Sequence, residues 1–138
     1  MQKYIDIILE EAQKAYRKDE IPVGCIIVKN DKVISKAHNS KQKTHKCINH
    51  AEVIAISKAE KKIKDWRLDD CELYVTLEPC PMCMEVIRQA RIKKVYYLLD
   101  SNFNNENNKK ITKIAIGNFE DQKKKYKEQI SLFFSTKR

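Results

Sequence analysis

The hydrophobic positions along the chain switch between a helical spacing and a strand-like spacing. Apolar side chains recur every three or four residues near the start, which predicts a first helix over residues 2–18. Pro22 prevents that helix from continuing. Residues 23–28 form a nearly unbroken β-favouring run, and residues 32–37 form a second one after an Asn-Asp pair that suits a turn. These two runs predict a β-hairpin.

The middle of the chain repeats this alternation twice. A polar loop over residues 40–48 leads to Asn49, which suits the N-cap of a helix that carries the following apolar residues. Residues 71–77 predict a third strand and residues 94–99 a fourth. Between them Pro81 suits the first position of a helix that runs to about residue 91. A helix between two strands favours a parallel pair with a right-handed crossover.

The last third of the chain has a weaker pattern. Residues 101–110 are rich in Asn and Lys and predict a loop, residues 111–116 a short fifth strand, and residues 119–134 a terminal helix. The sum predicts one α/β domain over residues 1–138, a three-layer α/β/α sandwich around a mixed, roughly five-stranded sheet. The expected apolar contacts of the terminal helix are Tyr126, Ile130, Leu132 and Phe133.

Composition and charge narrow the class of protein. With 138 residues, 42% of them hydrophobic, the chain has enough apolar material for a real core. It shows no signal segment and no apolar run of membrane-spanning length, so we expect a cytoplasmic protein. A net charge of +9 would attract a polyanion, and nucleic acid is the natural candidate. A Lys-, Asn- and Ile-rich composition can also reflect genome-wide codon bias, with the lysines on an ordinary solvated surface.

Two short motifs carry the candidate chemistry. His50-Ala51-Glu52 and Pro79-Cys80-Pro81-Met82-Cys83 together supply three zinc-type ligands and one carboxylate that need not bind the metal. A structural zinc is usually closed by four protein ligands, whereas a catalytic zinc takes three and leaves a position for water. Cys80 and Cys83 would lie in the first helical turn, where the helix N-terminus favours their thiolate form. The pattern therefore predicts a catalytic zinc with His50, Cys80 and Cys83 as ligands. The order of the two motifs also resembles the signature of zinc nucleobase deaminases, and that resemblance implies that Glu52 is the proton carrier.

The same residues have plainer interpretations when each is taken alone. A Cys-x-x-Cys pair also occurs as a redox pair or as half of a structural zinc knuckle. The joint presence of the His-x-Glu motif favours the catalytic site. Of the other cysteines, Cys25 and Cys71 are expected to be free thiols, and Cys47 could compete as a ligand but is more simply an ordinary thiol.

The order of these motifs, with Glu20-Ile21-Pro22-Val23-Gly24 before them and the run from Leu73 to Glu78 leading into the cysteine motif, resembles the bacterial tRNA-specific adenosine deaminases. These enzymes belong to the cytidine deaminase-like superfamily of zinc nucleobase deaminases. The resemblance extends from about residue 20 to residue 100. It implies conversion of the wobble adenosine to inosine in a tRNA anticodon stem-loop, one Zn²⁺ per subunit and a homodimer.

The resemblance also assigns substrate contacts. It implies that Asn39 hydrogen-bonds the flipped purine, although an Asn that merely ends a strand is also common because Asn suits turns. The backbone amide of Ala51, at a helix start, is a candidate donor to the base. His45 either faces the substrate, as a histidine does near this place in the family, or is a surface side chain.

The chain departs from the family pattern at two loops. Residues 46–49 replace the usual lead-in to the histidine motif, and residues 101–108 replace a loop that contributes to substrate contact in relatives. Phe103, in the second loop, either stacks on a base or packs back on the domain. These departures keep two alternatives open. One is a deaminase of a free nucleobase or nucleoside of the guanine or cytosine type, and the other is a non-catalytic, zinc-stabilised RNA-binding module.

Overall fold

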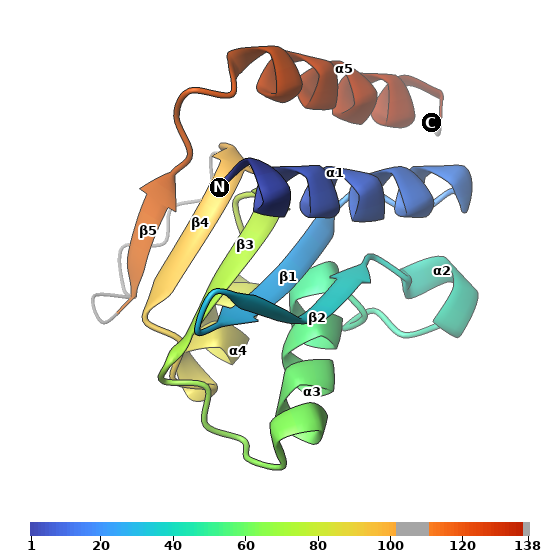
Figure 1. Ribbon diagram of the computed structural model, residues 1–138. Coiled ribbons are helices and arrows are strands. Elements are labelled where there is room, and N and C mark those ends of the chain that lie inside the picture. The colour runs from blue at the N-terminus through green and yellow to red at the C-terminus, as the bar shows by residue number, and fades with distance from the viewer. Residues whose placement is uncertain (102–110, 137–138) are drawn as a thin grey trace.

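A five-stranded mixed sheet forms the centre of the computed structural model, which describes residues 1–101 and 111–136 (Figure 1). The strand order is β2-β1-β3-β4-β5, with β1 antiparallel to both β2 and β3, and with β3, β4 and β5 parallel. This confirms the predicted mixed sheet. The strand bounds are β1 Gly24–Lys29, β2 Lys32–His38, β3 Cys71–Leu77, β4 Lys94–Leu99 and β5 Thr112–Ala115.

Helices cover both faces of the sheet, which gives the expected three layers (Figure 1). Strand β1 shows why, since Cys25 and Ile27 point into one apolar cluster while Ile26 and Val28 point into another. Alternate side chains of a strand face opposite sides of a sheet, so a strand that is apolar throughout needs cover on both. The helices are α1 Gln2–Arg17 and α5 Glu120–Thr136 on one face, α3 Ala51–Ile63 and α4 Pro81–Gln89 on the other, and the short α2 Lys41–Thr44.

Gly24 allows α1 to lie directly against the sheet. A Cβ atom at this position would be 2.0 Å from the carbonyl oxygen of Ile8 and 2.7 Å from the backbone nitrogen of Ala12. No residue with a side chain fits that space without moving the helix. Gly24 therefore sets how closely α1 packs on β1.

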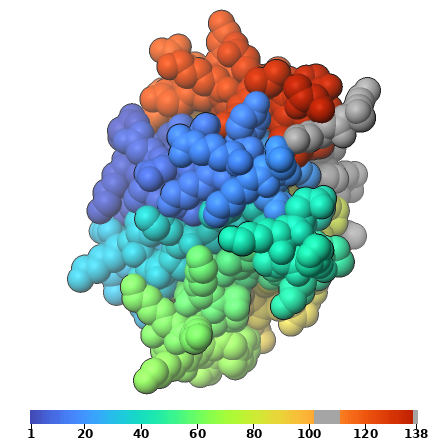
Figure 2. All heavy atoms as spheres, turned by 90° about the vertical axis from the view of Figure 1, so that its right-hand side faces the viewer, coloured from blue at the N-terminus to red at the C-terminus, as the bar shows by residue number. Residues whose placement is uncertain are grey.

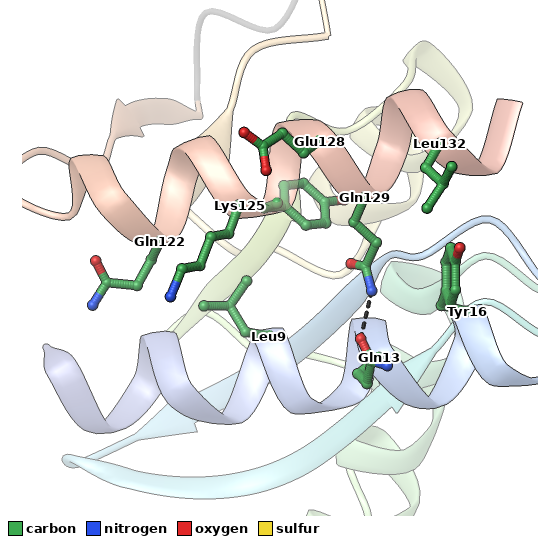
Figure 3. Close-up of a pocket in the computed structure, with 9 residues that line it drawn as sticks. Leu9, Gln13, Tyr16, Gln122, Lys125, Glu128, Gln129 and Leu132 are labelled. Carbon is green, nitrogen blue, oxygen red and sulfur yellow. Dashed lines mark hydrogen bonds between the residues drawn. The ribbon is translucent and has the colours of Figure 1, made fainter. Parts of the chain in front are cut away.

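The terminal helix α5 is fastened to the rest of the fold by Tyr126, which is buried. Its hydroxyl donates to the carbonyl oxygen of Pro22 at 2.7 Å and accepts from Thr76 at 3.0 Å. Gln129 of α5 also donates to Gln13 of α1 at 2.6 Å, across a surface cavity of about 490 Å³ between the two helices (Figure 3). No helix within residues 1–101 and 111–136 is long and apolar enough to cross a membrane.

Three local expectations were wrong. The loop predicted before Asn49 contains the one-turn helix α2, because the carboxylate of Glu20 accepts hydrogen bonds from its backbone. Asn49 is not the cap of α3, since His50 holds that position and the Asn49 side chain donates to Thr44 instead. Leu132 is 52% exposed and makes no core contact of the expected kind, although Tyr126 and Phe133 of the same helix are buried. The predicted loop contact of Phe103 lies outside the described residues.

Candidate metal centre and active site

Two helices begin at the candidate site, and each begins at a predicted ligand. His50 is the N-cap of α3 and Cys80 is the N-cap of α4, both with extended backbone angles. Pro81 occupies the first turn of α4, where its fixed φ favours the helix and its missing N–H costs nothing. The positive ends of both helix dipoles therefore point at one place, which favours bound anions and thiolates.

The three predicted ligands come together across 33 residues of sequence. The Nδ1 atom of His50 lies 3.8 Å from Sγ of Cys80 and 3.5 Å from Sγ of Cys83, and all three atoms lie within 4.8 Å of one another. Zinc bonds of about 2.3 Å to sulfur and 2.0–2.1 Å to nitrogen, at a tetrahedral angle, put sulfur and nitrogen about 3.6 Å apart. The donor set and its spacing fit a tetrahedral zinc with one position left over.

The pKa values of the two cysteine thiols are shifted in opposite directions. A hydrogen bond from Cys83 lowers the pKa of Cys80 to about 4, and the neighbouring His50 adds to the effect. The same hydrogen bond, together with burial, raises the pKa of Cys83. A hydrogen bond with Cys80 raises the pKa of His50. Since zinc takes thiolates and a neutral imidazole, these protons leave when the metal binds, and metal affinity rises with pH.

Glu52 lies in the first turn of α3, two residues from the His50 ligand. Its side chain is buried, and burial raises its pKa to about 7. Hydrogen bonds from its own backbone N–H and from Cys83 favour the ionised form but do not outweigh the loss of solvation. A carboxyl group with a pKa near neutrality can both accept and return a proton at physiological pH.

Asn39 and Ala51 are brought into contact. The side-chain oxygen of Asn39 accepts a hydrogen bond of 2.7 Å from the backbone N–H of Ala51, and Asn39 is buried. This bond satisfies one of the free N–H groups at the start of α3. In this structure the Ala51 amide therefore donates to Asn39 at the start of α3.

His45 and Cys47 lie outside the ligand cluster. Both are exposed, and His45 ends α2 in a left-handed conformation with φ 57°. The grouping of metal-binding side chains found within the described ranges consists of His50, Cys80 and Cys83. Cys47 is a free thiol in this structure, as its simpler interpretation predicted.

Two buried glutamates near the site were not predicted. Glu20 accepts hydrogen bonds from the backbone of α2, and Glu78 accepts from Ser101 and Lys113 at the ends of β4 and β5. In the sequence, only their neighbours could have drawn attention to these two glutamates. Glu20 precedes an Ile-Pro-Val-Gly run, and Glu78 directly precedes the cysteine motif. Sequence spacing cannot indicate which backbone amides such a carboxylate will meet.

A cavity of about 770 Å³ lies beside α2, lined by three lysines and by the acidic residues Asp19 and Glu20. Figure 2 shows the teal α2 segment standing at the surface next to the blue end of α1. Phe134, 46% exposed, contributes an aromatic face. The lining combines the ends of α1 and α5 with α2, and its lysines are Lys18, Lys41 and Lys43.

His50, Cys80 and Cys83, beside the buried carboxylate of Glu52, match the three-ligand pattern of catalytic zinc sites. The family model for the cytidine and deoxycytidylate deaminase zinc-binding region matches residues 1–99. The chain belongs to this zinc-binding deaminase family, and zinc is the cofactor that the ligand set and the family have in common.

Individual relatives give a finer comparison. The chain is 46% identical over 89 residues to a tRNA-specific adenosine deaminase of Streptococcus pyogenes serotype M18, a match that covers 64% of this chain and 56% of that protein. A solved structure from work on A-to-I editing by tRNA:A34 deaminases at the wobble position of transfer RNA matches with a TM-score of 0.71 and 35% identity, covering 72% of this chain and 77% of the other. Guanine deaminase of Bacillus subtilis matches with a TM-score of 0.68 and 36% identity, covering 72% and 64%.

Proposed function

We propose that this protein is a zinc-dependent hydrolytic deaminase that converts adenosine to inosine at the wobble position of tRNA. The observation that carries the proposal is the cluster of His50, Cys80 and Cys83 with the buried Glu52 beside it. The substrate assignment rests on the likeness to tRNA-specific adenosine deaminases and to the tRNA:A34 deaminase structure. The reaction takes up one water and releases one ammonia.

Each site residue has its own role in the proposed reaction. Zinc, when bound by His50, Cys80 and Cys83, supplies the Lewis acidity that makes water a nucleophile at neutral pH. Glu52 accepts the two protons of that water in turn, and it passes the first to the purine ring nitrogen and the second to the departing amine. Asn39 orients the base through its side-chain NH₂ group, and burial of Glu52 keeps bulk water from the proton transfers.

The lysines of the cavity beside α2 support the proposal of an RNA substrate. Lys18, Lys41 and Lys43 line the cavity beside α2, and the charge of Lys41 is close enough to act on the His50 imidazole. Lysines placed there attract the phosphates that flank a flipped nucleotide. His45, exposed at the end of α2, is placed by this proposal at the rim that the RNA meets.

We further propose that the protein acts as one domain in the cytoplasm and as a homodimer with one zinc per subunit. The dimer and the zinc stoichiometry are what the resemblance to the bacterial tRNA-specific adenosine deaminases implies. Sedimentation of the zinc-loaded protein tests the dimer, and a monomer at micromolar concentration would contradict it.

The experiment that tests the activity compares substrates. Purified, zinc-loaded protein is incubated with an anticodon stem-loop RNA that carries adenosine at the wobble position, and inosine is measured after nuclease digestion. A second set of reactions contains guanine, cytosine and adenosine as free molecules. We expect inosine in the RNA and no ammonia from the small molecules.

Guanine deamination is the second candidate, because the likeness to the Bacillus subtilis guanine deaminase is similar in extent. Ammonia from guanine without inosine in the RNA would replace the proposed function with this one. Absence of turnover on every substrate, with zinc bound, would instead support the non-catalytic RNA-binding module.

A further inference from the structure

Glu20 is a buried carboxylate whose hydrogen-bond partners are backbone amides of α2. It is 2% exposed, and its two oxygens lie 3.1 and 3.0 Å from the backbone nitrogen of Gln42. The second oxygen also accepts from the backbone N–H of Lys43 at 3.1 Å. Hydrogen bonds to an ionised acceptor are about twice as strong as neutral ones. Glu20 therefore ties the one-turn helix α2 to the chain that leads into β1.

The segment that contains α2 is also fastened at its base. The backbone N–H of Ser40 donates to the carbonyl oxygen of Asn49 at 3.0 Å, next to the bond between Asn39 and Ala51. Residues 40–49 thus form a loop that is closed at its two ends and held by Glu20 near its middle. A helix of four residues has no stability of its own in water, so its conformation depends on these outside contacts.

This loop borders the candidate active site. It runs from Asn39 to His50, one of the three clustered metal-binding side chains. It also contributes Lys41 and Lys43 to the cavity beside α1 and α5. The loop conformation therefore decides where two cations stand relative to the metal centre.

We infer that Glu20 is a positioning residue that holds the 40–49 loop ready for a polyanionic substrate, an inference that rests on the proposed function. Glu20 lines the cavity beside α2, but it is only 2% exposed and both of its oxygens accept hydrogen bonds from the α2 backbone, so its role is to hold the loop and not to bind the substrate. Glu20 affects RNA binding by keeping the 40–49 loop in one conformation. A loop that is only partly in the competent conformation lowers apparent affinity by the fraction that is competent.

Replacing Glu20 by Gln gives a test in which charge and order act in opposite directions. The change removes one negative charge, which by itself strengthens attraction to RNA. It also removes part of the acceptor capacity that holds α2, and if about a tenth of the loops stay competent, KM for the anticodon stem-loop rises roughly tenfold. We expect that rise in KM with an unchanged kcat and an unchanged zinc content.

Glu10→Gln is the matched control, because Glu10 is exposed on α1 and its replacement changes the net charge equally. We expect this control to leave KM unchanged or to lower it slightly. A second comparison places Glu20→Gln in a Lys41→Gln, Lys43→Gln background. The KM effect of Glu20→Gln should shrink there, since the cations that the loop presents are gone.

Hydrogen exchange tests the ordering without any substrate. The amides of Gln42 and Lys43 should exchange at least about tenfold faster in Glu20→Gln, if the closed population falls as assumed, while the amides of β3 keep wild-type protection. Unchanged exchange at these two amides, or an unchanged KM, overturns the inference. So does a joint fall of kcat and zinc content, which would mark a general folding role. If wild-type protein forms no inosine, the proposed function fails, and the exchange measurement still decides whether Glu20 orders the loop.

Discussion

Two buried glutamates on opposite faces of the sheet have opposite electrostatic surroundings. Glu11 on α1 and Glu52 on α3 are each 4% exposed. Burial disfavours the charge of Glu11, but hydrogen bonds from Lys14 at 2.7 Å and His38 at 3.1 Å outweigh it and lower the pKa of Glu11. Glu52 has no ion pair with Lys or Arg in the described structure, and burial raises its pKa to about 7.

The two glutamates are equally buried, so the difference in pKa comes from their hydrogen-bond and ion-pair partners. Glu11 stays ionised and joins α1 to the end of β2 through His38. Glu52 is held where either protonation state is accessible at neutral pH, next to a cluster that can hold a metal. The candidate metal ligands and Glu52 therefore lie with α3 and α4, whereas Glu11 and its ion pairs lie with α1 on the other face of the sheet.

Glu52→Gln should produce the largest effect. The change keeps the shape of the side chain but removes the proton acceptor, so we expect inosine formation to fall by about 10⁴-fold, the upper range for general acid/base catalysis. Zinc content, measured by metal analysis, should not change. Glu60→Gln, on the same helix but ten residues from His50, is the control and should keep its activity. An active Glu52→Gln protein would refute the assigned role.

Cys80→Ser should weaken metal binding by at least about 100-fold, because a hydroxyl is a poor zinc ligand compared with a thiolate. Zinc remaining after dialysis against a chelator is the measurement. Cys71→Ser is the control at the opposite end of β3, where the buried thiol lies beside Asp70. A Cys80→Ser protein that retains its zinc would show that a different ligand set binds the metal.

Tyr126→Phe tests how strongly the Tyr126 hydroxyl fastens α5 to the rest of the fold. Loss of the hydroxyl leaves the Pro22 carbonyl without its donor in a buried place, which should lower the free energy of unfolding by about 1–3 kcal/mol. Urea denaturation of the zinc-loaded protein measures it. Tyr16→Phe, a partly buried tyrosine on α1, should change stability by less than about 0.5 kcal/mol. Equal losses in both variants would contradict the assigned role of the Tyr126 hydroxyl.

Glu11→Gln should have the smallest effect and a distinctive pH dependence. The pKa of Glu11 in the folded protein lies below its usual 4.5, so its stabilisation is present above about pH 4.5 and is lost as pH falls through the lower folded value. We expect the variant to lose about 1 kcal/mol at pH 7, and we expect this loss to shrink as the pH falls below about 4.5. Stability curves between pH 3 and pH 7 would show this convergence. A gap that stays constant across this range would mean that the ion pairs contribute nothing.

The strands and the metal ligands were predictable because their signals are local. Strands β3 and β4 begin and end at the predicted residues, since runs of β-favouring side chains bounded by polar ones need no distant information. The clustering of His50, Cys80 and Cys83 was predictable because His-x-Glu and Cys-x-x-Cys are short motifs whose residue types match zinc chemistry. The exposure of Leu132 was not predictable, because a helical pattern cannot indicate how far a sheet extends beneath the helix.

The sequence by itself determined the alternation of helices and strands and singled out the three side chains that cluster, His50, Cys80 and Cys83. Only the tertiary structure decided that Asn39 accepts from the Ala51 amide at the start of α3, that Glu20 holds α2, and that Glu11 has an ion pair with Lys14 whereas Glu52 has none with Lys or Arg among the described residues. The physical reason is the range of the interactions. Propensity and motif act over a few residues, whereas the partner of a buried polar group is set by which distant backbone or side chain the folded sheet brings within hydrogen-bonding distance.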